Sequence, residues 1–432
     1  MATNPVTGNA QSDLALPSAY NTYMSASGYT AADVLAKATA AMGAAPVPKE
    51  ITVNPGTPWS SITIMLRDHL RRQVELSTGG RQTVLYDVLG GESIMNVIPK
   101  FMNADIHADL GSGVFPAFSV NGVEKPEIFA PAYDACLVNG LACSQPGKDP
   151  NTTLNHDEAR AACVNKGSNW HMMTNWEWAA LAYWMLKNGF QPNGNTNWGK
   201  SDAAPWETAP RGDNGQPGVA SGTGRTLTGL GPKTWRHDGT FQGVADLVGN
   251  IWRRVDGFKL VDGQVFMPDD NYYSLAEASW PAQGVYFDST GTTGTDTVAD
   301  TNGNAVLSSS RAVPSDDCGN GLGANAPDYD YNYHVGEGGW RGMGELSAYD
   351  SIALATRQRM LQALIAPKIS SAGAPPFSTV HGMLYARNYG ERLPFRGASW
   401  FFGAGAGLAA LNLLGRRSYV DTYLGFRPAF VP

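Results

Sequence analysis

Two stretches of the sequence decide its fold: residues 243–252, GVADLVGNIW, and residues 396–430, RGASWFFGAGAGLAALNLLGRRSYVDTYLGFRPAF. In the first, a glycine and an Asp-Leu pair precede Gly-Asn-Ile-Trp, which is typical of a buried turn that enters a strand. Asp246 and Asn250 can hydrogen-bond neighbouring backbone groups there, and Trp252 can fill the core. The stretch holds no nucleophile, so we predict a structural role for it.

Two sequence patterns in or near these stretches are superficially similar to functional motifs, one for dinucleotide binding and one for acid–base catalysis. The run GAGAG at 403–407 is superficially similar to a dinucleotide-binding loop. The chain ends 25 residues later, however, which leaves no room for the strand-helix-strand unit that such a loop needs. His237 and Asp238, beside Arg236, suggest acid–base chemistry. Because no nucleophile motif accompanies them, we predict an Asx turn with a solvated histidine.

The composition excludes several classes of protein. The chain has 432 residues, of which 43% are hydrophobic and 16% charged, with 50 glycines and 27 prolines. These values indicate a loop-rich globular protein of two or three domains, neither fibrous nor disordered. A net charge of −7 argues against a broad phosphate-binding surface, so no nucleic-acid partner is expected.

No membrane span or secretion signal is expected either. No apolar run approaches the roughly 20 residues that a membrane helix needs. The first residues, MATNPVTGNAQSDLALP, lack the basic and apolar regions of a classical signal peptide. We therefore expect a protein that works inside or in association with a cell, or that leaves it by lysis, as virion components do.

The four cysteines are Cys136, Cys143, Cys163 and Cys318. They contain no CxxC spacing, which excludes zinc-ribbon and thioredoxin-like sites. Cys136 and Cys143 could pair across a short loop. In the absence of a secretion signal, buried free thiols are the preferred prediction.

The sequence predicts two units. Residues 1–105 are expected to form a tail and an assembly or attachment unit. They contain a helix over 31–43 capped by Thr30, a second helix beginning at Ser60 or Ser61, and a strand followed by a turn at 83–91.

Residues 106–432 alternate short strand-like runs with Gly-, Asn- and Asp-rich loops, which predicts a mixed α+β domain. One helix is expected to begin after Asn155. Another is expected after Thr174, where Glu177 completes a capping box. Long loops are predicted at about 190–235 and 290–335.

In this order, the two opening stretches resemble the formylglycine-generating-enzyme type of C-type lectin fold. That family has a motif close to G-V-x-D-L-x-G-N-V-W, then R-G-G-S-W, and closes on G-F-R. Residues 170–178, WHMMTNWEW, loosely match its upstream helix start. The resemblance covers about residues 126–432 and implies this fold for the second unit.

This sequence lacks the metal-binding residues of the enzymes in this family. Formylglycine-generating enzymes bind copper through a C-terminal pair of cysteine thiolates, and no cysteine follows Cys318. The seven histidines also lack the HxxxHxE spacing of the related iron-dependent sulfoxide synthases. Trp252, Arg253 and Arg254 replace the family's W-E-W, which argues against a calcium site near this turn. We therefore expect no enzyme activity and no cofactor, with a structural calcium ion as the alternative.

The last segment also resembles the variable region of diversity-generating retroelement proteins, which include phage tropism determinants and bacterial surface binders. Their pattern is R-G-G-S-W-N-N-G-x-N-A-G-L-x-A-L-N-L-N-N-x-R-S, closing on G-F-R. The framework positions that match it are Arg396, Ser399, Trp400, Ala406, Gly407, Leu411, Asn412, Leu413, Ser418, Gly425, Phe426 and Arg427. With Asp246, Gly249, Asn250 and Trp252 of the first stretch, they are the expected scaffold.

The resemblance implies that the remaining positions of about 396–427 are hypervariable and contact the ligand. They are Phe401, Phe402, Gly405, Leu414, Gly415, Tyr419, Val420, Asp421 and Tyr423. The four aromatic residues among them would form an exposed binding face, because such side chains are strong interface anchors. The alternative is that they pack in the core of a C-terminal strand pair.

The expected function is therefore receptor recognition by a retroelement-diversified protein, on a phage tail or a cell. The expected partner is a protein or glycan on a target cell surface, and a homo-oligomer would add avidity. Two alternatives stay open. One is a divergent enzyme of the superfamily that uses His237, Asp238 or Glu177, and the other is a structural virion protein with an invariant C-terminus.

Overall fold

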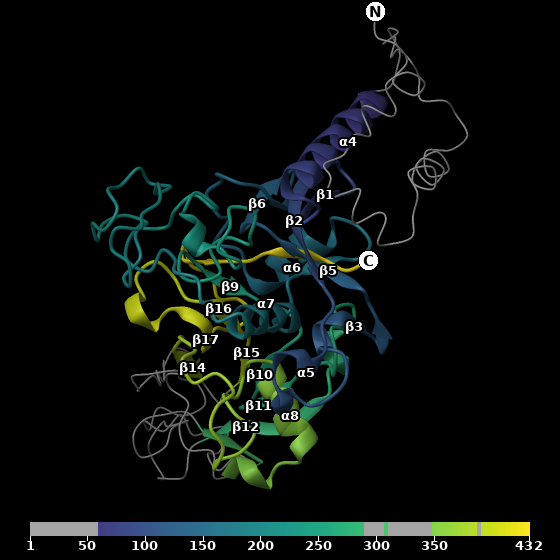
Figure 1. Cartoon of the computed structure of the whole chain (residues 1–432), viewed down its shortest axis with the longest axis vertical. Helices are drawn as coiled ribbons and strands as arrows, with labels where there is room; N and C mark the ends of the chain where they lie inside the picture. Colours follow the sequence, from purple (N-terminus) through teal and green to yellow (C-terminus); the bar gives the residue numbers. More distant parts are fainter. Residues whose placement is uncertain (1–58, 289–305, 310–347, 387–389) are drawn as a thin grey trace, which may run out of the picture. The chain divides into compact units, whose positions relative to one another are not determined.

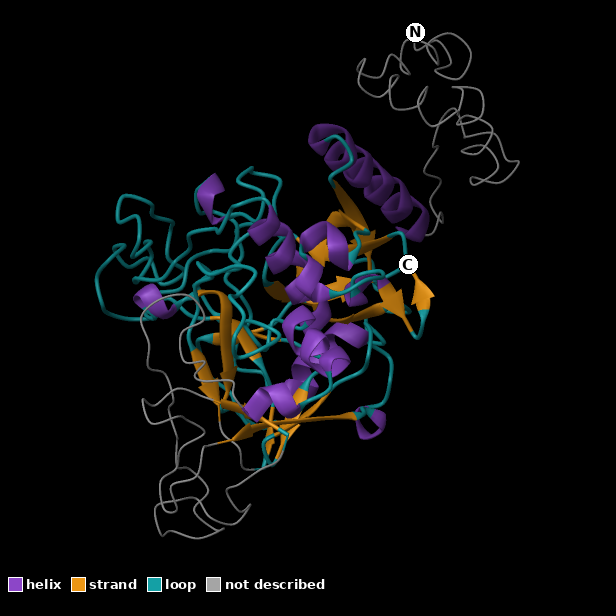
Figure 2. Ribbon diagram, turned by 60° about the horizontal axis from the view of Figure 1, so that its bottom comes forward, coloured by secondary structure: helices purple, strands orange, loops and turns teal. Residues whose placement is uncertain are grey.

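The computed structural model describes residues 59–288, 306–309, 348–386 and 390–432 (Figure 1). Within these ranges the chain is a mixed α+β protein with many strands, few helices and long loops, as Figure 2 shows. The predicted α+β class is thus confirmed. The helix predicted for residues 31–43, Cys318 and most of the predicted loop 290–335 lie outside the described residues.

Among the described residues, no helix combines the length and apolar character needed to cross a bilayer.

Three five-stranded sheets are described, and each joins strands that are distant in the sequence. The first contains, in spatial order, β1 (Gln82–Tyr86), β2 (Glu92–Pro99), β5 (Glu127–Pro131), β19 (Pro428–Phe430) and β8 (Trp170–Met172). The second contains β13 (Val306–Ser308), β12 (Ala282–Asp288), β11 (Gln264–Phe266), β10 (Lys259–Val261) and β15 (Glu391–Arg392). The third contains β14 (Leu384–Ala386), β17 (Gly407–Leu413), β16 (Phe395–Gly397), β9 (Trp252–Arg254) and β18 (Leu424–Gly425).

Two hairpins and a set of helices complete the described elements. The hairpins are β3 (Ser119–Val120) with β4 (Val123–Glu124), and β6 (Ala135–Val138) with β7 (Leu141–Ser144). The α-helices are α4 (Trp59–Thr78), α5 (Asn103–Ile106), α6 (His156–Val164), α7 (Asn175–Lys187) and α8 (Leu354–Gln362). Short 3₁₀ turns are η1 (Ala108–Leu110), η2 (Pro116–Phe118), η3 (Lys233–Trp235), η4 (Glu277–Ser279), η5 (Ala348–Ser351) and η6 (Gly403–Gly405).

The predicted boundary near residue 105 does not divide the structure. β2 pairs antiparallel with β5, with Val97 opposite Phe129, so residues on both sides of the boundary share one sheet. The same sheet also contains β19, at the C-terminal end of the chain. One compact unit therefore spans Met65–Pro432, and only residues 59–64 of the preceding unit are described.

Both predicted helix starts are confirmed, as is the predicted capping box at Thr174; Asn155 forms a second one. Asn155 caps α6 and Thr174 caps α7, each paired with a glutamate three residues later. Most side chains of α7 are buried, as expected for a helix that is apolar on all sides. The indole Nε1 of Trp178 donates to the Leu408 carbonyl oxygen of β17 (3.0 Å), and that of Trp176 donates to the Pro268 carbonyl oxygen (3.2 Å). α7 is thus the central core helix and is tied directly to the third sheet.

The cysteines of the described ranges are free thiols. Cys136 and Cys143 lie directly opposite each other in the β6–β7 hairpin, and Cys163 lies in α6; all three are buried. Burial is the main cause that raises the pKa of the Cys143 thiol to about 11. The preferred prediction of buried thiols is confirmed for these three residues.

Candidate ligand-binding surface

The third sheet carries the segment that the sequence predicts to bind ligand. Residues 398–406 connect β16 to β17, and residues 414–423 connect β17 to β18. β18 pairs parallel with β9, whereas β16 pairs antiparallel with both β9 and β17. The second connection therefore runs back along the sheet, and it brings Tyr423 to the end where the first connection begins.

The aromatic side chains of the two connections meet there. The Phe401 ring lies 5.0 Å from that of Phe402 and 5.4 Å from that of Tyr423, measured between centroids. Phe401 and Val420 are 42% and 46% exposed, respectively. The structure thus brings Phe401, Phe402 and Tyr423 together as a cluster that is open at Phe401. Leu414, by contrast, follows the opposite end of β17.

Phe402 and Tyr419 also pack inward. The Phe402 ring stands edge-to-face on Trp252 at 5.1 Å, and the Tyr419 ring stacks on Phe395 at 6.1 Å. Both are only partly exposed, as are Leu414, Asp421 and Tyr423. The two alternatives, an exposed binding face and a packed core, therefore each apply to some of these aromatic residues. Phe401 is exposed, whereas Phe402 and Tyr419 partly pack against the interior.

Two predicted contact positions are wrong. Gly405 and Gly415 are buried. A Cβ on Gly415 would lie 2.2 Å from the Phe395 ring, and one on Gly405 would lie 2.6 Å from Met383 Sδ. These glycines are therefore positions where the neighbours leave no room for a side chain, and they do not present one to a ligand.

The connection 414–423 is anchored largely through its backbone. Six of its carbonyl oxygens accept hydrogen bonds from residues outside it, five of them within 417–423. The donor–acceptor pairs are Leu393 N to Gly415 O, His156 N to Arg417 O, Arg254 Nη2 to Tyr419 O, Thr153 N to Asp421 O, Arg225 Nη1 to Thr422 O, and Trp252 N to Tyr423 O. Since these acceptors are backbone atoms, this part of the anchoring does not depend on which side chains the residues carry.

Arg417 fixes the start of this connection. Its guanidinium pairs with Asp157, Glu277 and Glu391, with nitrogen–oxygen distances of 2.6, 2.5 and 2.8 Å. Hydrogen bonds to Glu391 and then Glu277 raise its pKa above the ordinary arginine value. The Arg417 guanidinium is therefore paired within the protein and is not available to bind a ligand.

His156 lies beneath the same connection and is fully buried. Neither of its ring nitrogens has a hydrogen-bond partner within the described part of the chain. One ring nitrogen, an Asp256 carboxylate oxygen and a Glu277 carboxylate oxygen lie within 4.8 Å of one another, as metal ligands would. However, Arg160 already pairs with both carboxylates, at 2.7 and 3.6 Å, so the group is better described as an ion-pair network.

Replacing His156 with leucine will reduce the loss of folding stability that occurs as the pH falls below 6.5. Burial, followed by the charge of Arg254, lowers the pKa of His156 from 6.5 to about 3. Below pH 6.5 the His156 imidazole therefore binds a proton in the unfolded chain but not in the folded chain. Folding stability consequently falls by about 1.4 kcal/mol per pH unit through this group. His156→Leu removes this dependence and leaves stability at pH 7.5 equal or higher, because it also removes unpartnered polar atoms.

Urea unfolding at pH 7.5, 6.0 and 5.0 checks this expectation for His156. Parallel pH profiles for the wild type and the leucine variant would contradict it.

A fully buried ion-pair group lies at the end of residues 396–427, the predicted binding segment. Asp134 receives Arg253 Nε at 2.8 Å and Arg253 Nη2 at 3.0 Å, and Arg427 Nε lies 2.8 Å from the same carboxylate. Arg253 is the first of the two arginines that follow Trp252. Sequence reasoning missed Asp134, which no motif marks.

The turn residues of the first stretch have distant partners. Asn250 Oδ1 accepts from the Thr226 backbone N–H (2.7 Å) and from Asn195 Nδ2 (3.1 Å). Asp246 Oδ2 accepts from the Gly229 N–H (2.7 Å). The structural role predicted for this stretch is confirmed, but the predicted bonding to neighbouring backbone is wrong. These side chains instead hold the long loop 190–235 against the sheet.

The other expected scaffold residues lie in the interior or near strand ends, except Ser418, which is exposed in the connection 414–423. Arg396 is buried and donates from Nη2 to Asn175 Oδ1 (2.8 Å). Asn412 Oδ1 accepts from the Leu414 N–H (2.9 Å). The buried ones are Gly249, Trp252, Ser399, Trp400, Ala406, Gly407, Leu411, Leu413, Gly425, Phe426 and Arg427.

The residues of the enzyme alternative are engaged in local structure. Glu177 accepts from the Thr174 N–H and contacts His171 Nε2, each at 2.9 Å. Asp238 Oδ1 accepts from the Thr240 N–H (2.9 Å), which confirms the predicted Asx turn. His237 is buried rather than solvated, so that part of the prediction is wrong. Its Nδ1 accepts from the Val244 N–H (2.7 Å), and burial lowers its pKa to about 4.

Sequence reasoning missed the aromatic residues of the loop 190–235. The Trp198 ring lies 6.3 Å from that of Trp400 and 6.4 Å from that of Phe401. In Figure 1 the teal loops of this region lie beside the yellow C-terminal segments, in agreement with these contacts. Tryptophan in a Gly- and Asn-rich loop was the available signal, since such a loop offers it little local core.

Neither protein-family models nor curated proteins match this chain.

Proposed function

We propose that this chain is a retroelement-diversified ligand-binding protein. It has the formylglycine-generating-enzyme type of C-type lectin fold and presents residues of about 396–427 to a ligand. The observation that carries the proposal is the backbone anchoring of residues 417–423 by five framework donors. Anchoring through carbonyl oxygens tolerates a change of side chain at the anchored positions, which is the physical requirement for a hypervariable surface.

The open side of the aromatic cluster supports binding rather than catalysis. Phe401 and Val420 lie exposed on a surface whose backbone is fixed, so little entropy is lost when a partner covers them. The candidate catalytic groups His237, Asp238 and Glu177 are instead engaged in turn and helix-cap contacts. Recognition through such a face needs no cofactor.

The proposed partner is a macromolecule on a target cell, bound by a protein that a virion or a cell displays. A shallow face of a few aromatic anchors binds weakly as a single copy. A homo-oligomer would then gain avidity through several linked copies.

Sequencing this gene and its flanks in many sibling isolates tests the proposal. We expect a nearby near-copy of the codons for about 396–427 that differs only at adenines. Substitutions should gather at the partly or fully exposed predicted positions, which are Phe401, Phe402, Leu414, Tyr419, Val420, Asp421 and Tyr423. Gly405 and Gly415 should stay constant, because a Cβ there meets neighbouring side chains. An invariant C-terminus without a near-copy would contradict diversification.

A further inference from the structure

The most exposed large apolar side chain of the described residues is a tryptophan outside the predicted binding segment. Trp206 is 80% exposed and lies in the turn 201–207 of the long loop. A tryptophan left in water on a protein surface commonly marks an interaction site, since this side chain contributes more binding energy per contact than most. Its position relative to the binding segment is therefore informative.

The turn 201–207 borders the binding segment directly. The Gly403 N–H donates to the Thr196 carbonyl oxygen (2.9 Å), and the Asp202 N–H donates to Thr196 Oγ1 (2.9 Å). A Cβ on Gly403 would lie 3.6 Å from Asp202 Oδ2. The Trp198 N–H, at the base of the turn, donates to the Trp400 carbonyl oxygen (2.8 Å). The turn and the residues that follow Trp400 therefore form one continuous surface.

The backbone on either side of Trp206 is fixed by hydrogen bonds. The Ser201 N–H donates to the Glu207 carbonyl oxygen (3.0 Å), and the Glu207 N–H donates to that of Ala204 (2.8 Å). The Glu207 carboxylate accepts from Trp235 Nε1 (2.8 Å), which ties the turn to the core. Trp206 is thus an exposed anchor on an ordered turn, and it loses little entropy on binding.

The charged groups beside these aromatic residues are mainly acidic. Outside the predicted contact positions, Asp202 is exposed and Glu207 partly exposed, and Lys200 is a partly exposed cation of the same loop. A second cation, Arg225, is matched by Asp149 through two contacts of 2.6 Å. Arg416 lies at the opposite end of the connection 414–423. The surface therefore complements a partner with positive charge.

We propose that Trp206 and Trp198 form a constant half of the ligand-binding surface, and that the ligand is a protein presenting a basic, partly apolar patch. This inference rests on the proposed function and adds a partner class to it. The diversified residues determine which of these proteins binds, and the loop tryptophans make contacts that are common to all of them.

A library of the full chain tests this inference. Codons 401, 402, 414, 419, 420, 421 and 423 are randomised, and the displayed chains are selected on lysozyme and on α-lactalbumin, a basic and an acidic protein of the same fold. We expect more binders on lysozyme. Those binders should lose at least 30-fold in affinity on Trp206→Ala. Unchanged thermal melting of the variant establishes that the fold is intact, as expected for a side chain so exposed.

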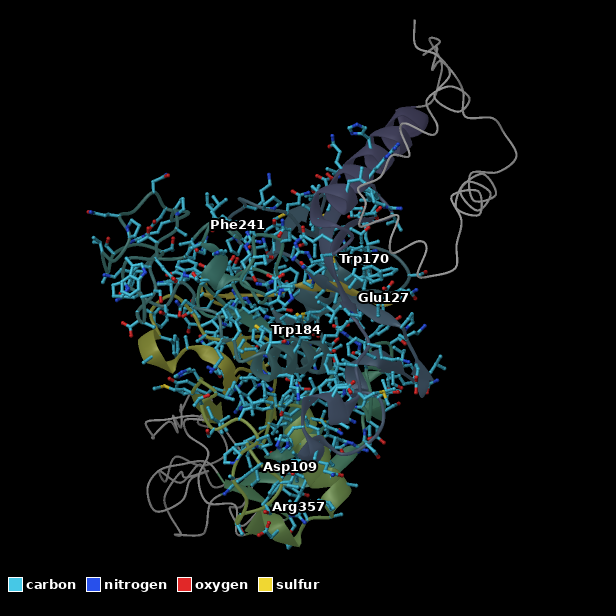
Figure 3. The ribbon with its side chains drawn as sticks, viewed as in Figure 1. Asp109, Glu127, Trp170, Trp184, Phe241 and Arg357 are labelled. Carbon is cyan, nitrogen blue, oxygen red and sulfur yellow. The ribbon has the colours of Figure 1, made fainter. Side chains whose placement is uncertain are left out.

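Phe241→Ala is the matched control, since Phe241 is an exposed aromatic residue (64%) on another turn, labelled in Figure 3. Its neighbour Gln242 accepts, through its carbonyl oxygen, from Gln82 and Asn96 of the first sheet. We expect the Phe241 variant to keep full affinity.

Each contrary outcome overturns a distinct part of the inference. Lysozyme binders that lose less than threefold on Trp206→Ala would exclude the constant half while leaving the proposed function intact. Equal numbers of binders on the acidic protein would exclude the preference for positive charge. Binding of the wild-type chain to an oligosaccharide array that depends on Trp206 would replace the protein ligand with a glycan. A library that yields no binders on either protein would count against the proposed function itself.

Discussion

Replacing Asp134 with alanine will lower the free energy of unfolding by about 3–5 kcal/mol, the range expected when one partner of a buried ion pair is removed. Asp134 is fully buried between Arg253 and Arg427, which are also buried. Its carboxylate lies 2.8 Å from the Nε atom of each arginine. Without it, two guanidinium groups remain in a low-dielectric interior where the buried Asp246 is the one carboxylate left to oppose their charges, and most of their desolvation is no longer offset.

Asp149→Ala is the matched control. Asp149 makes the same two-contact pairing, at 2.6 Å, with Arg225, but 42% of its side chain is exposed. Exposed pairs contribute only about 0–1 kcal/mol, so this variant should unfold at nearly the wild-type urea concentration. Equal losses in the two variants would contradict the assignment of Asp134 as the charge that stabilises the arginine pair.

Elements whose signal is local could be predicted from the sequence. The helices after Asn155 and Thr174 begin where their capping boxes place them, because a cap involves residues only three apart. The structural character of residues 243–252 was likewise readable from its turn residues. Asn250 adopts φ +64°, a left-handed conformation that asparagine tolerates better than most residues.

Features that depend on distant pairing could not be predicted. Asp134 is 119 residues from Arg253, and nothing in its own neighbourhood marks it as their shared counter-ion. The domain boundary was misplaced for the same reason. The strands over 82–99 have no local feature that shows they pair with β5 and share a sheet with the C-terminal strand.

The candidate site was predicted in part. The motif of residues 396–427 located the surface, and Phe401 and Val420 are exposed as expected. Side-chain direction was not readable, because these connections have neither the helical nor the strand period that separates buried from exposed positions. Gly415 was therefore grouped with contact residues although it lies against the Phe395 ring.

Replacing Gly249 with alanine will lower the free energy of unfolding by about 3–5 kcal/mol, from backbone strain and overpacking together. Gly249 adopts φ +69°, and a Cβ there would lie 2.2 Å from the Asn195 carbonyl oxygen. This oxygen cannot withdraw easily, because it accepts from the Asn250 N–H at 2.6 Å. On its other side, the Gly249 N–H donates to the Gly397 carbonyl oxygen (2.8 Å), so a shift would reach β16.

Gly147→Ala separates the two causes. Gly147 has nearly the same φ, +68°, but no atom lies within 4 Å of a Cβ built there. Only the left-handed strain of about 1–2 kcal/mol then applies. Urea unfolding of both variants should therefore differ by at least about 2 kcal/mol, the typical size of the overpacking contribution. Because Gly249 lies where the loop 190–235, β16 and the turn 243–252 meet, a loss no larger than that of Gly147→Ala would mean that this junction is pliable. A pliable junction could not hold the binding segment in one conformation while its side chains change.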